Sequence, residues 1–239
     1  MYHSFLTIKE VVEVHPILPK KDMTEEDIKL QYITPAVTSK WSRGKITMET
    51  QITDGKINLR GNMVFREKPK RADYLLYLSA NNPIAVIEAK DNNHTVSHGI
   101  QQAMEYARML DLPFAFSSNG DGFAEHDFLT GTEREFGLDE FPTEAELIAR
   151  FKQESGLSPA QETVIDQPYY SSQNTYPPRY YQRIPSTARW TPSPGPAAAA
   201  AGDGHRNRQD LYRLQIVYRL LKSGMKRKGT LSADRNILV

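Results

Sequence analysis

The fold of this chain is decided by two stretches of its sequence, Lys70-Arg71-Ala72-Asp73-Tyr74-Leu75-Leu76-Tyr77 and Ile87-Glu88-Ala89-Lys90. Each overlaps a predicted β-strand, over residues 72–78 and 83–89 respectively. The second strand is an apolar run, which is typical of a sheet buried on both faces. An acid and a lysine, separated by one residue, stand at the end of this strand.

The spacing of these charged residues indicates a metal-dependent reaction. Alternation along a strand sends Glu88 and Lys90 to the same face. If Asp73 lies on the neighbouring strand, its carboxylate can join that of Glu88 around one hard cation, and oxygen ligands are the preference of Mg²⁺. Such an ion polarises a phosphate oxygen and activates a bound water, which Lys90 would position. An isolated acid-x-lysine tripeptide is more commonly a surface ion pair, so the surrounding sequence must decide.

The remaining sequence predicts helices and strands around these two strands. Thr24 is expected to cap a helix reaching Val37, with Asp27 completing a variant of the capping box. The other expected elements are strands at 45–53 and 57–60 joined in a hairpin at Asp54-Gly55, a helix at 96–110, strands at 112–117 and 123–128, and a helix at 143–153 capped by Thr143. Residues 155–196, rich in proline, serine, tyrosine and glutamine, are interpreted as a linker. This order indicates an α/β fold.

The acids and the following helix resemble a known nuclease signature. Asp73 precedes Glu88-Ala89-Lys90 by fourteen intervening residues, and the next helix carries Gln102-Ala103-Met104-Glu105-Tyr106. This arrangement is similar to the PD-(D/E)XK motif, with the Q-x-x-x-Y motif of type I restriction enzyme R subunits and RecB-like nucleases. Ala72 stands where the motif has proline. The strings Lys29 to Val37 (KLQYITPAV) and Ser117-Ser118-Asn119-Gly120 also resemble R subunits.

The resemblance implies an α/β fold with a PD-(D/E)XK restriction-endonuclease-like core, in which helices flank a mixed central β-sheet. It implies that Asp73, Glu88 and Lys90 are catalytic, and that Asp73 and Glu88 hold Mg²⁺, for which Mn²⁺ can substitute. Gln102 and Tyr106, four residues apart on one helix face, would contact the DNA backbone or support the metal ligands. Glu25 matches an acidic position near the metal in such families; it reads equally well as a solvated acid favoured by the helix dipole.

The implied function is that of a magnesium-dependent endonuclease domain of a type I R subunit, which hydrolyses DNA phosphodiester bonds. The implied partners are double-stranded DNA and the methyltransferase and specificity subunits. Two alternatives remain, a non-catalytic DNA-binding or assembly module of the same complex and a standalone RecB-like repair nuclease. A stable complex with methyltransferase and specificity subunits would exclude the standalone enzyme.

The chain is divided into four expected regions: an N-terminal extension at 1–21, the nuclease core at 22–135, a helical extension and linker at 136–175, and a truncated start of a helicase-like motor at 176–239. Pro178 to Arg183 resembles the segment that opens this motor, but no G-x-x-x-x-G-K-[ST] loop follows. Codons for Asp203 to Leu211 can encode MATGTGKT one nucleotide over, so we hypothesise that Pro185 to about Arg213 is translated in a shifted frame. ATP serves the complete family enzyme, but this chain is not expected to bind it. A helical pattern returns after Asp210 and ends at Ser223-Gly224.

Composition sets the remaining expectations. The formal net charge is +1, so DNA affinity must come from local patches. One candidate patch, equally well a solvated hairpin edge, consists of Arg60, Arg66, Lys68, Lys70 and Arg71. His94 and His98 are expected to lie on the surface or to face phosphate groups, in preference to binding a metal. The chain has no cysteine and no long apolar run, which makes a cytoplasmic protein without membrane contact the default expectation.

Overall fold

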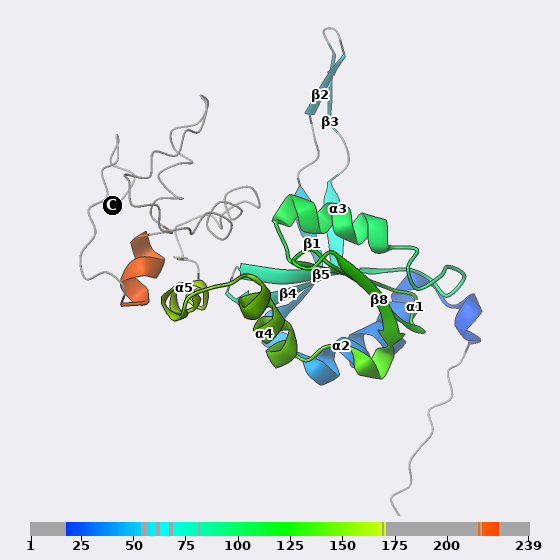
Figure 1. Ribbon diagram of the computed structural model, residues 1–239. Coiled ribbons are helices and arrows are strands. Elements are labelled where there is room, and N and C mark those ends of the chain that lie inside the picture. Colours follow the sequence, from blue (N-terminus) through cyan, green and yellow to red (C-terminus); the bar gives the residue numbers. More distant parts are fainter. Residues whose placement is uncertain are drawn as a thin grey trace, which may run out of the picture.

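A computed structural model describes residues 18–53, 57–60, 63–66, 69–80, 82–168, 170, 215 and 217–224. Within these residues, six strands form a mixed sheet in the order β1-β4-β5-β6-β7-β8 (Figure 1). Its strands are β1 Ile46–Thr53, β4 Lys70–Ser79, β5 Asn82–Ala89, β6 Phe114–Ser118, β7 Gly122–Asp127 and β8 Thr132–Gly137. Only β5 and β6 pair in parallel; the other neighbours are antiparallel. The mixed sheet expected from the sequence is confirmed.

Helices cover both faces of this sheet. The helical elements are η1 Lys20–Asp22, α1 Glu25–Ile28, η2 Lys29–Ile33, α2 Thr34–Lys40, η3 Arg43–Lys45, α3 Ile100–Leu110, η4 Leu138–Glu140, α4 Glu144–Glu154 and α5 Pro159–Ile165. α3 lies over one face, and α1, α2 and α4 lie over the other (Figure 1). Two hydrophobic clusters correspond to these two faces: Val86 packs with α3, whereas Ile87 packs with α2 and α4.

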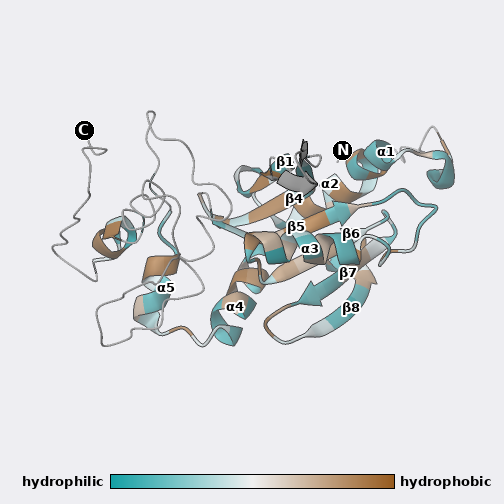
Figure 2. Cartoon of the chain, turned by 90° about the horizontal axis from the view of Figure 1, so that it is seen from above, coloured by the Kyte–Doolittle hydropathy of each residue, from teal (hydrophilic) through white to brown (hydrophobic). Residues whose placement is uncertain are grey.

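The two central strands are hydrophobic, as the sequence predicts. The side chains of β5 are buried except for a partly exposed Pro83, and hydrophobic colour is concentrated along β4 and β5 (Figure 2). The parallel β5–β6 pair requires a crossover, which α3 supplies. Because β5 is sandwiched between α3 and the first helices, an acid near its end is removed from water.

The first helix begins with the expected cap and then changes its winding. The Thr24 hydroxyl accepts the Asp27 N–H, and the Asp27 carboxylate accepts the Thr24 N–H in return. The following element, η2, is a π-helical turn in which the Thr34 N–H reaches the Lys29 carbonyl. Pro35 follows directly and has no N–H to donate, yet α2 continues to Lys40. The wider turn therefore carries the helix across the proline.

Three sequence predictions on strand pairing and the linker are wrong. β1 does not form a hairpin with β2 (Ile57–Arg60), because β1 pairs with β4 and β2 pairs with β3 (Met63–Arg66) in a separate two-stranded sheet. β8 lies where no strand was predicted, and the predicted linker begins too early, because Ser158 caps α5 within it. The division into four regions stays a prediction; Phe141, after the predicted core, packs in the main hydrophobic cluster.

The segment around residues 215–224 packs against α5. Gln215 accepts the Tyr170 N–H at 2.6 Å and donates to the Tyr170 carbonyl at 2.8 Å. The Arg219 guanidinium donates to the carbonyls of Val164 and Ile165, the last residues of α5. This segment is helical at 215 and 217–222, and Gly224 adopts a φ of 74°, as expected for a helix that ends at glycine. The motor-like string Pro178 to Arg183 and the shifted-frame segment lie outside the described residues.

None of the described helices has the length and apolar character needed to span a membrane.

Candidate active site

Asp73 and Glu88 meet on the two central strands. β4 and β5 pair in a register that places Tyr74 opposite Ile87, and Asp73 and Glu88 are the next residues along this ladder. Both are buried, with 8% and 1% of their surface exposed. Their carboxyl groups lie close enough for each to shift the pKa of the other. The strand pairing thus creates the two-carboxylate pair expected from the sequence.

Both carboxylate oxygens of Asp73 have donors. Oδ2 accepts the N–H of Ala89 at 2.8 Å, and Oδ1 accepts Nζ of Lys29 at 3.0 Å. Burial raises the pKa of Asp73, but the hydrogen bonds from Glu88, Ala89 and Lys29 outweigh burial, so the net pKa lies below the ordinary value. Asp73 is therefore the ionised member of the pair.

Glu88 is the protonated member of the pair. Burial, the hydrogen bond to Asp73 and the negative charge of Asp73 together raise the pKa of Glu88 to about 9. Its second oxygen, Oε2, is buried and has no hydrogen-bond partner. A buried carboxyl oxygen without a partner costs free energy, unless a ligand satisfies it. Glu88 thus has an oxygen available for a ligand.

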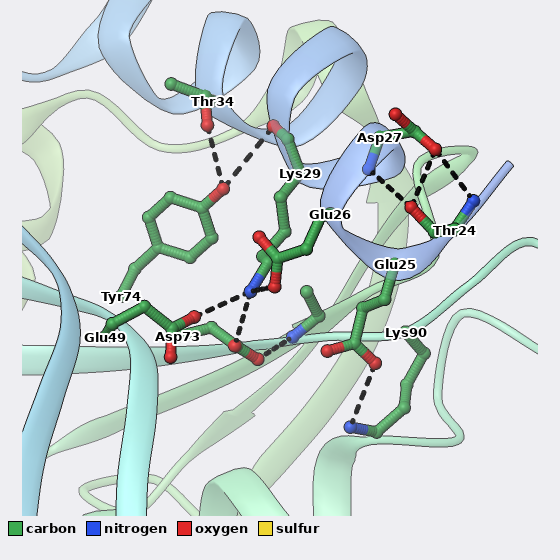
Figure 3. A network of polar contacts seen from close by, with 11 residues as sticks. Thr24, Glu25, Glu26, Asp27, Lys29, Thr34, Glu49, Asp73, Tyr74 and Lys90 are labelled. Carbon is green, nitrogen blue, oxygen red and sulfur yellow. Dashed lines mark hydrogen bonds and ion pairs between the residues drawn. The ribbon is translucent and has the colours of Figure 1, made fainter.

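Lys29 is a central residue of the site that sequence reasoning did not identify. Its side chain is 2% exposed, and its Nζ lies 2.5 Å from Glu26 Oε1, 2.7 Å from Glu49 Oε1 and 3.0 Å from Asp73 Oδ1 (Figure 3). Burial lowers the pKa of Lys29, but the hydrogen bonds to these three carboxylates raise it well above the ordinary value. Lys29 is therefore a fixed positive charge. The overlooked signal was a lysine four residues before the buried Ile33, on the helix face that packs inward.

Glu49 reaches Lys29 through an unusual backbone conformation. Its φ of 50° lies in the left-handed region, which non-glycine residues rarely adopt. It stands opposite Asp73, between the pairs Met48–Tyr74 and Thr50–Ala72 of the β1–β4 ladder. No sequence pattern marks such a residue, because the conformation is imposed by tertiary contacts.

Lys90 and Glu25 lie at the solvent side of the site. Glu25 Oε2 is 3.8 Å from Lys90 Nζ (Figure 3), and their side chains are 38% and 19% exposed. Burial raises the pKa of Glu25, and Lys90 partly offsets this increase. Gly99, before α3, leaves room for Lys90, because a Cβ there would lie 3.4 Å from Lys90 Cγ and 3.2 Å from Ser117 Cβ. Lys90 is thus held between the first helix and the start of α3.

Gln102 and Tyr106 interact along α3, as their four-residue spacing predicts. Gln102 Nε2 donates to the Tyr106 hydroxyl at 3.1 Å. Tyr106 is buried, and burial raises its pKa; the hydrogen bond from Gln102 partly offsets this rise, and Glu88 adds to it once its carboxyl group is ionised. This interaction connects the Q-x-x-x-Y pair electrostatically to the paired acids.

The paired acids suit a hard cation. Two adjacent carboxylates of which one must hold a proton, with one oxygen unpartnered, form a donor set in which a divalent ion can replace that proton. In the part of the chain described, no three His, Cys, Asp or Glu side chains form a ready metal cage. Mg²⁺ commonly takes only one or two carboxylates and completes its shell with water.

His94 pairs with Asp91, and the centroid of its ring lies 4.1 Å from that of His98.

The basic residues of the predicted patch are only partly placed. Lys70 forms an ion pair with Glu105 of α3, and Arg71 is exposed on β4. The side chains of Arg60 and Arg66 and the whole of Lys68 lie outside the described part. Phosphate contact by this stretch stays a prediction.

The sheet and its paired acids define a PD-(D/E)XK-like α/β core, and three comparisons give the relatives. Residues 61–112 match the family model for the second domain of the type I restriction enzyme EcoKI endonuclease subunit. The chain is 39% identical over 230 residues to the type I restriction enzyme EcoAI endonuclease subunit of Escherichia coli, which covers 91% of this chain and 28% of that protein. A fragment structure described as an HsdR subunit of a type I restriction enzyme from Vibrio vulnificus YJ016 matches with a TM-score of 0.67 and 30% identity, over 89% of this chain and 41% of that one.

In sequence and fold, the chain is therefore related to the R subunits of type I restriction enzymes, and the resemblance expected from its motifs is confirmed. It spans less than a third of the length of the curated relative.

Proposed function

We propose that this chain carries the magnesium-dependent endonuclease centre of a type I restriction R subunit, which hydrolyses DNA phosphodiester bonds. One observation carries the proposal: the carboxyl groups of Asp73 and Glu88 are adjacent on paired strands in a buried position, and Lys90 stands two residues beyond Glu88. A purely structural core gains little from two adjacent buried acids, because one of them must be kept neutral. A metal ion gives both acids a role.

Asp73 and Glu88 would each hold the ion through a carboxylate oxygen. A bound Mg²⁺ supplies Lewis acidity at a phosphate oxygen and makes a bound water more acidic. Glu88 must release its proton when the ion binds, so binding strengthens with rising pH. Asp73 is already ionised and is fixed by Lys29 and Ala89.

Lys90 and the residues beside it would handle the substrate. The Lys90 side chain is 19% exposed, so its ammonium group could reach a phosphate or the attacking water. Glu25 is close enough to orient it. Gln102 and Tyr106 lie on the helix that packs on β5 and would contact the DNA backbone or support Glu88.

The relatives are named as subunits of type I restriction enzymes, which supports a proposal that this chain also acts in a complex. We propose that the chain acts on double-stranded DNA within a complex that includes the methyltransferase and specificity subunits of a type I restriction enzyme, in the cytoplasm. Recognition of the DNA sequence would then belong to the specificity subunit.

Calorimetric titration with Mg²⁺ and Mn²⁺ tests the metal site in the absence of partners. The variants Asp73→Asn and Glu88→Gln keep the size of each side chain and are expected to lose binding. Glu133→Gln on β8, which removes an exposed acid paired with His126, is the matched control and should bind like the wild type. Binding that persists in both site variants would exclude this metal site and favour the non-catalytic assembly module.

A further inference from the structure

Three departures from regular structure converge on the ammonium group of Lys29. The helix widens into the π-turn that begins at Lys29, β1 places Glu49 at a φ of 50°, and a lysine lies in the core with 1% of its surface exposed. Each departure costs free energy, and π-turns and left-handed residues are concentrated at functional sites. Their convergence indicates that this ammonium has a role beyond packing.

The surroundings of Lys29 are those of a bound cation. Carboxylate oxygens from three different elements, α1, β1 and β4, lie within 3.0 Å of its Nζ. Oxygen donors from separate elements around one positive centre are what a hard divalent ion requires. Here a covalently attached ammonium group fills that position.

Asp73 lies between this ammonium and Glu88. Its Oδ1 accepts a hydrogen bond from Lys29 and its Oδ2 accepts one from the Ala89 N–H, so each oxygen has one further lone pair, and the proton of Glu88 can occupy only one of these two. A metal ion beside Glu88 can use this remaining capacity. A second ion on the far side of Asp73 would have to displace Lys29 from the three carboxylates.

We propose that Lys29 is a positioning residue that takes the place of a second divalent cation, so that the centre binds a single metal ion at Asp73 and Glu88. This inference rests on the proposed function and specifies its metal stoichiometry. The fixed charge of Lys29 keeps Asp73 oriented at every metal concentration, and it repels a second ion at short range.

The number of Mn²⁺ ions bound by the full chain tests this proposal, measured by electron paramagnetic resonance of free Mn²⁺ together with calorimetry. The wild type is expected to bind one ion. Lys29→Arg keeps the positive charge and is also expected to bind one ion. Lys29→Met removes the charge at similar length and frees three carboxylates, so it is expected to bind two. In Lys29→Met with Glu49→Gln, the second ion should be lost again.

The outcomes separate this proposal from the proposed function. No ion in the wild type overturns both. Two ions in the wild type, or one ion of unchanged affinity in a folded Lys29→Met variant, overturn only the role of Lys29. If Lys29→Met does not fold, the ¹³Cε signal of Lys29 in the wild type decides. The proposal requires that Mg²⁺ saturation leave it a buried ammonium, and a shift to the values of solvent-exposed lysine would overturn it.

Discussion

Lys29 and Asp73 are 44 positions apart in the sequence, yet Nζ of Lys29 lies 3.0 Å from Oδ1 of Asp73 in a buried contact. This contact joins the first helix to the central strand β4. It also fixes the one carboxylate that the neighbouring pair keeps ionised. The ion pair therefore links the stability of the fold to the geometry of the proposed metal site.

Loss of the Lys29 charge should destabilise the metal-free protein. Lys29→Met leaves the buried Asp73 without its counter-ion, and breaking one side of a buried pair costs about 3 kcal/mol. Because the freed carboxylates can bind a cation, added Mn²⁺ should restore part of this stability. Urea denaturation with and without Mn²⁺ measures both effects, with Lys29→Arg as the control. An equal response to Mn²⁺ in both variants would contradict the expectation.

The metal-free protein should lose stability as the pH rises from about 5.5 to 8.5. The folded state holds the Glu88 proton with a pKa of about 9, whereas an unfolded chain releases it near the ordinary glutamate pKa of 4.5. The contribution of Glu88 to the free energy of unfolding is therefore fully present below its pKa in the unfolded chain. It is lost as the pH rises toward its pKa in the folded state, by ~1.4 kcal/mol per pH unit and a few kcal/mol at most.

The Glu88→Gln variant is the control for this pH dependence, because it cannot ionise. Its free energy of unfolding should vary less over the same pH range, and at pH 8.5 it should equal or exceed that of the wild type. Thermal unfolding in the presence of a chelator measures this. Parallel pH profiles for the two proteins would show that Glu88 does not hold its proton in the folded state.

Gly99→Ala should impair cleavage without weakening metal binding. The added methyl group would lie 3.2 Å from Ser117 Cβ, which is tighter than an ordinary contact, and 3.4 Å from Lys90 Cγ, so the start of α3 must move by a few tenths of an ångström beside Lys90. Gly44→Ala, where no atom lies within 4 Å of the added Cβ, is the matched control. The readouts are DNA cleavage by the reconstituted complex, expected to fall about tenfold or more in Gly99→Ala, and calorimetry with Mn²⁺. Equal cleavage by both variants would argue against a role for the position of Lys90.

A second buried ion network should contribute to stability but not to metal binding. Arg150 of α4 donates to Glu125 and Asp127 of β7 at 2.7 Å each, and both acids are almost fully buried. Arg150→Met removes the guanidinium that pairs with Asp127 and leaves Glu125 with the half-exposed Arg134, so it should cost about 3 kcal/mol. Arg134→Met removes a second guanidinium from Glu125, but its side chain is 54% exposed, so the cost should stay below about 1 kcal/mol. Urea denaturation measures the loss in the free energy of unfolding for each variant and so distinguishes the two expected costs.

The parts of the fold that depend on local sequence could be predicted. The Thr24 and Thr143 caps were found because the capping box spans only four residues. β5 was found because a strand buried on both faces is an unbroken apolar run. The partner of β1 was predicted wrongly, because Asp54-Gly55 favours a local turn while the core favours the distant β4.

The candidate site divides in the same way. Asp73, Glu88 and Lys90 stand out in the sequence because their spacing forms a motif. Lys29 and Glu49 do not, because their ion pair depends on a helix and a strand meeting over β4, and because the backbone of Glu49 is unusual only in the folded chain. The roles of all five residues stay predictions until the variants are measured.

The packing of Arg219 on α5 has a mechanical consequence. The Arg219 guanidinium donates to the last carbonyls of α5. Asn82, the first residue of β5, also donates through its Nδ2 to the Ile165 carbonyl, at 3.5 Å. These contacts join the helix at 217–222, through the end of α5, to the beginning of the strand that carries Glu88. A displacement of that helix would therefore reach β5 at the end opposite to Glu88.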